Sequence, residues 1–283
     1  MKWLALRNPE RRRERRNLDT QRAKATMSCV DVPTESYRSV SGLGSSGCSG
    51  LLANVSIVIP VGPEDESWRS LIGDLLGSGT DAELLLVGAR AEPTDVNLLR
   101  AHRTPPRDIR WQATTAGRGH QMNVGATLST RPFLWFLHAD SRVGVDALFA
   151  LERSLHSHPR GLHYFDLAFQ DDGPGFVRLN AWGVRVRSDY LRLPFGDQAF
   201  CMSRETFQRL GRFDESAAYG EDHLLVWRAH RQRVPLHRVG ALIATSARKY
   251  RTSGWLRTTL VHGWRTWRQA VPQVVKFFWN RSG

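Results

Sequence analysis

The sequence predicts an α/β fold with a doubly wound, mostly parallel open sheet and flanking helices, for three reasons. Short apolar runs of strand length recur at 55–60 (VSIVIP), 83–87 (ELLLV) and 133–137 (FLWFL). Segments with apolar residues at helical spacing separate such runs, as in 66–76. Strands that alternate with helices pair in parallel, because each helix carries the chain back to the edge where the next strand begins.

Each predicted element follows from its local pattern. The run 55–60 is rich in β-branched residues and stops at a proline, which is typical of a buried parallel strand. In the helix predicted over 66–76 the apolar side chains share one face, and they are Trp68, Leu71, Ile72, Leu75 and Leu76. The remaining predicted elements are a weaker strand at 109–112, a helix at 121–128, a helix from near Val145, and helices at 204–210 and 224–232.

The chain of 283 residues is long enough to bury a sizeable core. Residues 39–50 (SVSGLGSSGCSG) cannot bury apolar surface, so we expect 1–50 to be a disordered basic leader that ends in a Gly/Ser linker. A single folded domain is expected over 51–283. No apolar run approaches the length of about eighteen residues that a membrane-spanning helix needs.

The excess positive charge lies at the two ends of the chain. The net charge is +13, yet residues 51–244 hold 22 basic and 22 acidic side chains. A protein that binds double-stranded nucleic acid carries its basic residues on the folded domain, so we expect no nucleic-acid partner. The cysteines (Cys29, Cys48 and Cys201) are widely spaced, and no secretory signal is visible, which favours a cytoplasmic protein.

Polar residues follow the predicted strands at 55–60 and 133–137. Ligands of open α/β sheets bind at the carboxyl ends of the strands, which directs attention to these residues. His138 and Asp140 stand two residues apart after the second run, and this spacing suits a divalent metal that substrate phosphates share. The alternative is that Asp140 caps the helix near Val145 or the turn at Ser141, and that His138 is a satisfied interior histidine.

Five motifs in order resemble family 2 glycosyltransferases, which have the GT-A fold, and the resemblance covers about 55–270. It resembles most a bacterial subgroup linked to radical-SAM and selenium-related gene neighbourhoods, which also reads His-Ala-Asp instead of Asp-X-Asp and continues into Thr-Ser-Ala-Arg, here 245–248. The motifs are VSIVIP (55–60), GRGHQMNVGA (117–126), FLHADS (136–141), GDQAFCMSRETFQRLGRFDE (196–215) and GED (220–222).

The resemblance implies a glycosyltransferase with a nucleotide-diphospho-sugar donor, an acceptor hydroxyl and an inverting, metal-dependent displacement. Asp222 matches the catalytic base, and His138 and Asp140 match the position that holds Mn²⁺ or Mg²⁺. Imidazole favours softer metals than Mg²⁺, which makes Mn²⁺ a candidate. The other residues that the resemblance places around the donor and acceptor are Pro60, Val61, Glu64, Arg118, Gln121, Asn123, Asp197, Gln198 and Glu221.

Several of these residues have simpler interpretations. Glu64 is equally well a solvated loop acid, and Asp197 can serve a turn after a glycine. Glu221 and Asp222 can stabilise the first turn of the helix that follows them, a role compatible with catalysis. Gly88 stands where many relatives have a nucleoside-binding acid, so a second hypothesis is a catalytically degenerate protein that binds a sugar nucleotide or a lipid. Nucleotidyl transfer would need a Gly-rich, lysine-containing phosphate loop after the first strand, which is absent.

The tail from about residue 245 mixes aromatic and basic residues and has no acid. This composition is typical of a helix that lies at a membrane surface, because the aromatic rings sit at headgroup level and arginine attracts anionic lipid. This interpretation goes with a lipid-linked acceptor and peripheral attachment at the inner face of the membrane, and it stands beside a second one. The alternative is a helix packed across the active site.

Overall fold

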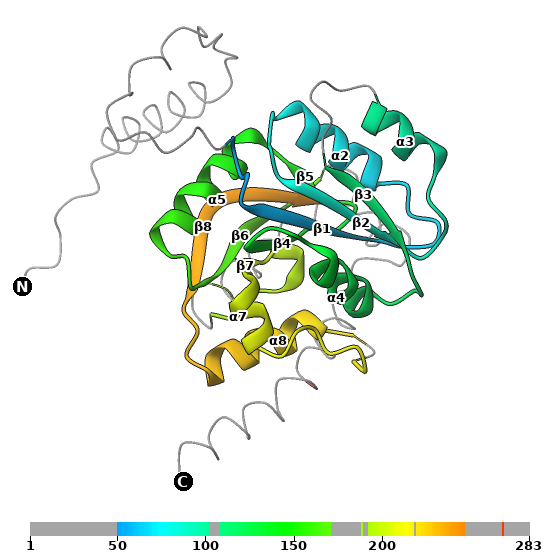
Figure 1. Cartoon of the computed structure of the whole chain (residues 1–283). Coiled ribbons are helices and arrows are strands. Elements are labelled where there is room, and N and C mark those ends of the chain that lie inside the picture. The colour runs from blue at the N-terminus through cyan, green and yellow to red at the C-terminus, as the bar shows by residue number, and fades with distance from the viewer. Residues whose placement is uncertain are drawn as a thin grey trace, which may run out of the picture. The chain divides into compact units, whose positions relative to one another are not determined.

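An eight-stranded sheet organises the part of the chain that the computed structural model describes, residues 50–101, 108–170, 188, 192–217, 219–246 and 268 (Figure 1). The predictions for the leader and for the tail beyond Ser246 therefore lie outside the described residues, apart from Arg268. By its contacts the chain divides into two units, Met1–Gly47 and Cys48–Gly283, and the described residues belong to the second. The strands are β1 Val55–Val61, β2 Glu83–Gly88, β3 Ile109–Ala113, β4 Phe133–Phe136, β5 Arg142–Val143, β6 Leu162–Phe169, β7 Cys201–Ser203 and β8 Leu236–Thr245.

The first half of the sheet is parallel and confirms the predicted alternation of strands and helices. Its spatial order is β3-β2-β1-β4, and every neighbouring pair in it is parallel. Val58 lies opposite Leu85 on one side and Phe136 on the other, so the centre of β1 is covered by strands at both edges. All seven residues of β1 are buried, as expected for a central parallel strand.

The second half of the sheet was not predicted in detail. Strand β7 pairs antiparallel with β4 and with β6, β6 pairs parallel with β8, and β5 pairs antiparallel with β8. The sheet continues to β5 through these pairs, which brings the ends of β6 and β8 to the loop that follows β4.

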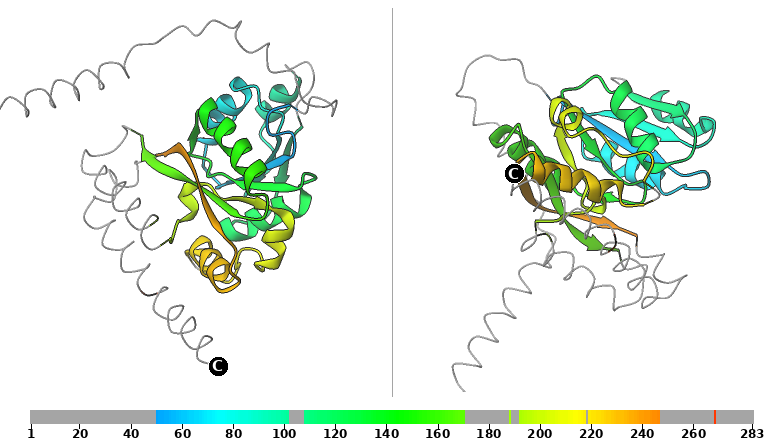
Figure 2. Two further views of the ribbon diagram at one scale, coloured as in Figure 1. Left: turned by 90° about the vertical axis from the view of Figure 1, so that its left-hand side faces the viewer. Right: turned by 90° about the horizontal axis from the view of Figure 1, so that it is seen from below.

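Helices cover both faces of the sheet, which confirms the doubly wound fold (Figures 1 and 2). One core contains side chains of α2 and α5, and the other contains side chains of α4, α7 and α8. Strand β4 contributes side chains to both cores, because Trp135 packs in the first core and Leu134 and Phe136 pack in the second. The helices are α2 Trp68–Gly77, α3 Thr94–Ala101, α4 Arg118–Leu128, α5 Val145–Ser157, α7 Arg204–Arg209 and α8 Glu221–Arg231, with a 3₁₀ turn η1 at Gly196–Gln198.

Two helices begin earlier than predicted, and both shifts concern the functional site. Helix α4 begins at Arg118 instead of residue 121, and α8 begins at Glu221 instead of residue 224. Both follow a glycine with a positive φ angle, Gly117 at 149° and Gly220 at 68°. A glycine adopts such angles without the steric cost of a Cβ, so the chain turns sharply and the polar residue after it falls into the first helical turn. Within the described residues, no helix has both the length and the apolar character that crossing a bilayer requires.

Candidate active site

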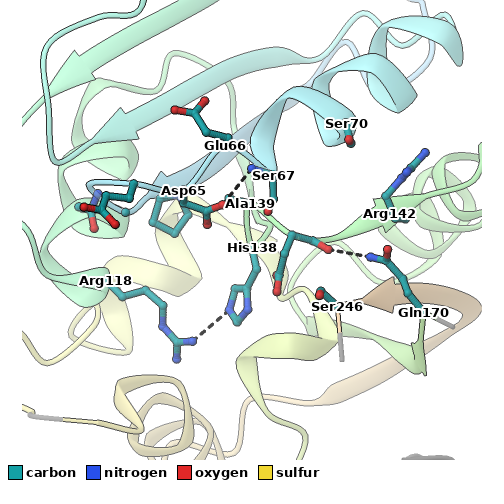
Figure 3. Close-up of a pocket in the computed structure, with 15 residues that line it drawn as sticks. Asp65, Glu66, Ser67, Ser70, Arg118, His138, Ala139, Arg142, Gln170 and Ser246 are labelled. Carbon is teal, nitrogen blue, oxygen red and sulfur yellow. Dashed lines mark hydrogen bonds between the residues drawn. The ribbon is translucent and has the colours of Figure 1, made fainter. Parts of the chain in front are cut away.

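A cavity of about 850 Å³ opens at the carboxyl ends of β1 and β4 (Figure 3). Its walls come from the loop after β1, the first turns of α2 and α4, the turn after β4, and the ends of β6 and β8. This position agrees with the expectation that ligands of open α/β sheets bind beyond the carboxyl edge. The lining residues are Pro60, Gly62, Glu64, Asp65, Glu66, Ser67, Ser70, Arg118, Gln121, His138, Ala139, Asp140, Arg142, Gln170 and Ser246.

The turn after β4 places His138 and Asp140 on the wall of this cavity. The Ser141 N–H donates to the His138 carbonyl over 3.0 Å, which closes the turn. The Gln170 side chain donates to the Asp140 carbonyl over 3.0 Å, as Figure 3 shows, and the Thr245 hydroxyl donates to Oδ1 of Asp140 over 3.3 Å. Helix α5 is capped by Gly144 without a side-chain bond, so Asp140 does not cap it.

Arg118 connects three charged or polar groups at the edge of the cavity. Its Nε donates to Oε1 of Glu221 over 2.5 Å, and its Nη2 lies 3.6 Å from Oδ2 of Asp222. Its Nη1 lies 3.3 Å from Nε2 of His138, the contact drawn in Figure 3. Burial opposes the charge of the guanidinium, but Asp222 and then Glu221 outweigh it and raise the pKa of Arg118. The arginine therefore remains a cation at the junction of α4, α8 and β4.

Asp222 is nearly buried and firmly held. Its side chain accepts the N–H of Gly196 over 2.5 Å and the N–H of His223 over 2.9 Å, and the residue is 7% exposed. Burial raises the pKa of the Asp222 carboxyl, but the charge of Arg118 and the two backbone donors reverse this effect and hold the pKa below its usual value. The group is thus a carboxylate at neutral pH and can accept a proton.

Asp222 faces a second, much smaller hollow beside the large cavity. This hollow measures about 10 Å³, roughly the space of one water molecule. Arg118 and His138 line both spaces. A Cβ at residue 196 would press on the Asp222 carboxylate, so Gly196 permits the close approach of η1 to α8. Asp222, Arg118 and His138 are therefore brought together from three distant parts of the chain.

Four other residues assigned to the site have side chains engaged elsewhere. Val61 packs in the core, and the Asn123 amide exchanges hydrogen bonds with the backbone of Phe213. Gln198 donates to the Phe165 carbonyl and accepts from Ser188, whereas the Gln121 amide joins the carbonyls of Val61 and Val87. Val61, Asn123 and Gln198 do not line the described cavities, whereas Gln121 forms part of the wall.

The other residues that the resemblance places at the site also fall into two groups, those that line the large cavity and those that do not. Pro60 and Glu64 line the large cavity. Glu221 is 5% exposed and accepts a hydrogen bond from Arg118. Asp197 lies in η1 and is partly buried, directly after Gly196, whose N–H donates to Asp222. The structure therefore collects Pro60, Glu64, Arg118, Gln121, His138 and Asp140 around one cavity, with Glu221 and Asp222 behind Arg118.

Sequence reasoning missed several lining residues. Ser67 is the N-cap of α2 and Ser70 lies in its first turn, and their position at the start of a predicted helix after β1 is a usable signal. Arg142 and Gln170 have no local signal, because strand pairing in the unpredicted half of the sheet brings them to the cavity. Arg142 is held by Asp74 through contacts of 2.6 and 2.7 Å, which fixes its direction.

Gly88 is explained by packing. A Cβ at this position would overlap the indole ring of Trp111, which reaches across from β3 and donates its N–H to the Arg90 carbonyl over 3.2 Å. The indole also meets Trp68 edge-on, with ring centres 5.7 Å apart. An acid cannot stand at this position while Trp111 occupies the space.

Gly88→Ala is expected to destabilise the fold by about 1–3 kcal/mol, because the added methyl group overlaps the indole ring of Trp111. Chemical denaturation measures the change. Gly73→Ala is the matched control, since Gly73 lies on an exposed face of α2 with nothing near its Cβ position. The free energy of unfolding of the control is expected to rise by up to about 1 kcal/mol, because alanine has a higher helix propensity than glycine. Equal effects of the two substitutions would refute the packing explanation.

The residues at the predicted metal position offer one carboxylate and one imidazole. Among the described residues, no group of three or more His, Cys, Asp or Glu side chains is arranged to hold a metal ion. Magnesium in phosphate sites is commonly held by one or two carboxylates together with substrate phosphates and water, so Asp140 fits such a shared ion. His138 fits less well, because its Nε2 faces the cationic Arg118.

No protein-family model matches the chain, and no curated protein does. Among solved structures, residues 1–349 of TarS from S. aureus superpose with a TM-score of 0.53 at 12% identity, covering 68% of this chain and 60% of that one. The same fragment in complex with UDP-GlcNAc gives a TM-score of 0.53 at 13% identity and covers 68% of this chain and 58% of that one. A further structure of S. aureus TarS gives a TM-score of 0.52 at 10% identity and covers 69% of this chain and 37% of that one. This chain therefore spans at most 60% of the length of these TarS structures. At such identity the likeness concerns the fold, and the chain has the GT-A-type α/β fold that its sequence predicts.

Proposed function

We propose that the protein is a glycosyltransferase that moves a sugar from a nucleotide-diphospho-sugar to an acceptor hydroxyl. The observation that carries the proposal is the arrangement of Arg118 between a cavity of about 850 Å³ and the held carboxylate of Asp222. A cation beside the cavity suits a diphosphate, and an ionised carboxylate behind it suits proton removal. Assignment to family 2, and to the subgroup with His-Ala-Asp, rests on the sequence motifs.

The donor class has support from the fold. One TarS structure of the same fold is a complex with UDP-GlcNAc. Helix α4 begins at Arg118, which lines the cavity, so a phosphate group there would gain from the guanidinium and from the positive end of the helix. A nucleotide-diphospho-sugar provides the two phosphates that such a site would hold.

In the proposed reaction the acceptor oxygen attacks the anomeric carbon, and the bond from that carbon to the diphosphate oxygen breaks. The leaving nucleoside diphosphate takes the bonding electron pair, and the acceptor proton passes to Asp222. A single displacement of this kind inverts the anomeric centre. Arg118 stabilises the charge that develops on the leaving phosphate, because its pKa keeps it protonated throughout the physiological range.

A divalent ion, Mn²⁺ or Mg²⁺, is part of the proposal, with Asp140 as its protein ligand and His138 beside it. When bound, the ion would add Lewis-acid stabilisation of the leaving phosphate. The hydrogen bond from Thr245 to Oδ1 and the bond from Gln170 to the Asp140 carbonyl orient this residue without any ion.

A thermal-shift screen of nucleotide sugars, each with and without Mn²⁺ or Mg²⁺, tests the donor proposal. At about 100 times Kd a donor adds about 2.7 kcal/mol, which raises Tm by roughly 5–10 °C in a domain of this size. Arg118→Ala is expected to lose most of the shift, whereas Arg160→Ala, at an exposed residue between α5 and β6, keeps it. The absence of a shift with every donor would refute the proposal.

A binding protein without transferase activity is the second candidate, and the screening of Asp222 by Arg118 and His138 favours it. Such a protein would give the thermal shift and show no release of nucleoside diphosphate with any acceptor. Turnover assays therefore separate the two functions.

We further propose a lipid-linked acceptor, from the basic and aromatic composition of residues 245–283. In a flotation assay, anionic vesicles are expected to carry the full chain to the lipid fraction. Neutral vesicles are not expected to carry it. Failure to bind anionic vesicles would contradict the membrane part of the proposal and leave the donor chemistry unaffected.

A further inference from the structure

Arg118 and His138 form the partition between the large cavity and the hollow that contains Asp222. Each of them lines both spaces, and Asp222 lines only the smaller one. The hollow, at about 10 Å³, has room for a water molecule but not for a sugar hydroxyl with its carbon atom. An acceptor that enters through the large cavity therefore reaches Asp222 only if this partition opens.

The three contacts of the Arg118 guanidinium differ in strength. The bond from Nε to Glu221 is short and charge-assisted at 2.5 Å, whereas Nη2 stands 3.6 Å from Asp222, beyond hydrogen-bonding distance. The contact of Nη1 with His138 is also long, at 3.3 Å. Glu221 thus anchors the base of the guanidinium, and its two terminal nitrogens are held more weakly.

Asp222 does not depend on Arg118 alone for stabilisation. Its carboxylate keeps the N–H groups of Gly196 and His223 when the guanidinium turns away. A buried carboxylate that retains two backbone donors stays hydrogen-bonded at both oxygens, so moving the arginine costs the attraction between the two charges but leaves no oxygen unsatisfied. The obstacle to the movement is therefore the charge attraction between Arg118 and Asp222 together with the long contact to His138, and the donor has to exceed it.

We propose, building on the function proposed above, that the donor diphosphate turns the terminal nitrogens of Arg118 away from Asp222 and His138, about the fixed bond to Glu221. A diphosphate offers bidentate, charge-assisted acceptors to a planar guanidinium, and these outweigh two contacts of 3.3 and 3.6 Å. The movement opens the partition. Donor binding thereby exposes the base, and the acceptor binds second.

The order has a chemical consequence. Without donor, Asp222 is screened from the cavity, so a hydroxyl compound in the site meets a guanidinium instead of a base. With donor, the same arginine lies on the leaving phosphate and the carboxylate faces the acceptor. Glu221 is a positioning residue in this scheme, because it acts on the donor through Arg118.

A thiol placed at the base reports the opening directly. In a Cys29→Ser, Cys48→Ser background, where the remaining Cys201 is fully buried, Asp222→Cys is expected to react with iodoacetamide about tenfold faster when inorganic pyrophosphate is bound. When Arg118→Ala is added, the thiol should react with iodoacetamide at the faster rate with or without pyrophosphate. Ser157→Cys, exposed at the end of α5, is the control whose rate should not change.

Crystals of the unmodified chain with UDP provide a second measurement that needs no variant. The guanidinium is expected on the phosphates, still bonded to Glu221 and more than about 4 Å from Asp222. Bound pyrophosphate with an unchanged thiol rate, or UDP bound with Arg118 still against Asp222, would overturn the inference and leave the proposed function standing. If calorimetry shows that neither pyrophosphate nor UDP binds, the inference and the proposed function both fail.

Discussion

Asp222→Asn is expected to lower the rate of sugar transfer by roughly 10²- to 10⁴-fold, the contribution typical of a positioned general base. An amide has the size of the carboxylate but cannot take the acceptor proton at neutral pH. Because the native carboxyl has a lowered pKa, it is already ionised at neutral pH, and the loss should persist across the neutral range. Turnover at saturating donor, followed by release of nucleoside diphosphate, measures the effect.

The substitution separates catalysis from binding. Asp222 does not line the large cavity, so the affinity for donor should change little while kcat falls. Asp146→Asn is the matched control: Asp146 also stands in the first turn of a helix, α5, but is exposed and distant in sequence. It reproduces the loss of a charge at a helix N-terminus and should keep full turnover. Full turnover in Asp222→Asn would remove the base assignment.

The parallel half of the fold could be predicted because its signals are local. Strands β1, β2 and β4 are continuous apolar runs, and amphipathic α2 joins the first two. The other half carries weaker signals. Strand β8 alternates in burial and contains Gly240, and β6 has His163 at a fully buried position. A polar residue inside a strand and a strand with one open face both weaken the apolar pattern on which prediction depends.

The same reasoning explains which site residues could be predicted. Arg118 and Asp222 stand one and two residues after glycines that precede helices, and the structure places their side chains 3.6 Å apart. Asn123 and Gln198 also stand in the motifs, but their amides satisfy buried backbone groups. Sequence alone does not separate an amide that binds a ligand from one that completes the core, because both need the same donor and acceptor atoms.

The second large effect is expected for stability in acid and arises from the buried histidine in β6. His163 is fully buried between α5 and β8, accepts the Ser154 hydroxyl at Nδ1 over 2.7 Å and donates from Nε2 to the His158 carbonyl over 3.0 Å. These two hydrogen bonds engage the single donor and the single acceptor of the neutral imidazole. Burial above all, and the neighbouring rings of His237 and His158 in addition, lower the pKa of His163 to about 4, although its bond to the His158 carbonyl acts in the opposite direction.

The sign of the pH dependence follows from the two pKa values. Above pH 6.5, the ordinary value for histidine, the ring is neutral in the folded and the unfolded chain. Between pH 6.5 and about 4 the unfolded chain takes up a proton that the folded chain does not, so stability falls as the pH falls. Below about 4 both states are protonated and the loss is complete, at about 3 kcal/mol from this group.

His237 strengthens the effect because it is stacked on His158 with ring centres 4.0 Å apart, and a Cβ at Gly161 would overlap its ring. Burial and the neighbouring His158 lower the pKa of His237 as well, so protonating the cluster places like charges on packed rings. Denaturation midpoints from pH 7 to 4 measure the loss. His163→Gln keeps a donor and an acceptor without the charge and should flatten the dependence, whereas exposed His156→Gln should not. If His163→Gln and the native chain lost stability equally over this interval, the acid sensitivity would have to come from the carboxylates instead.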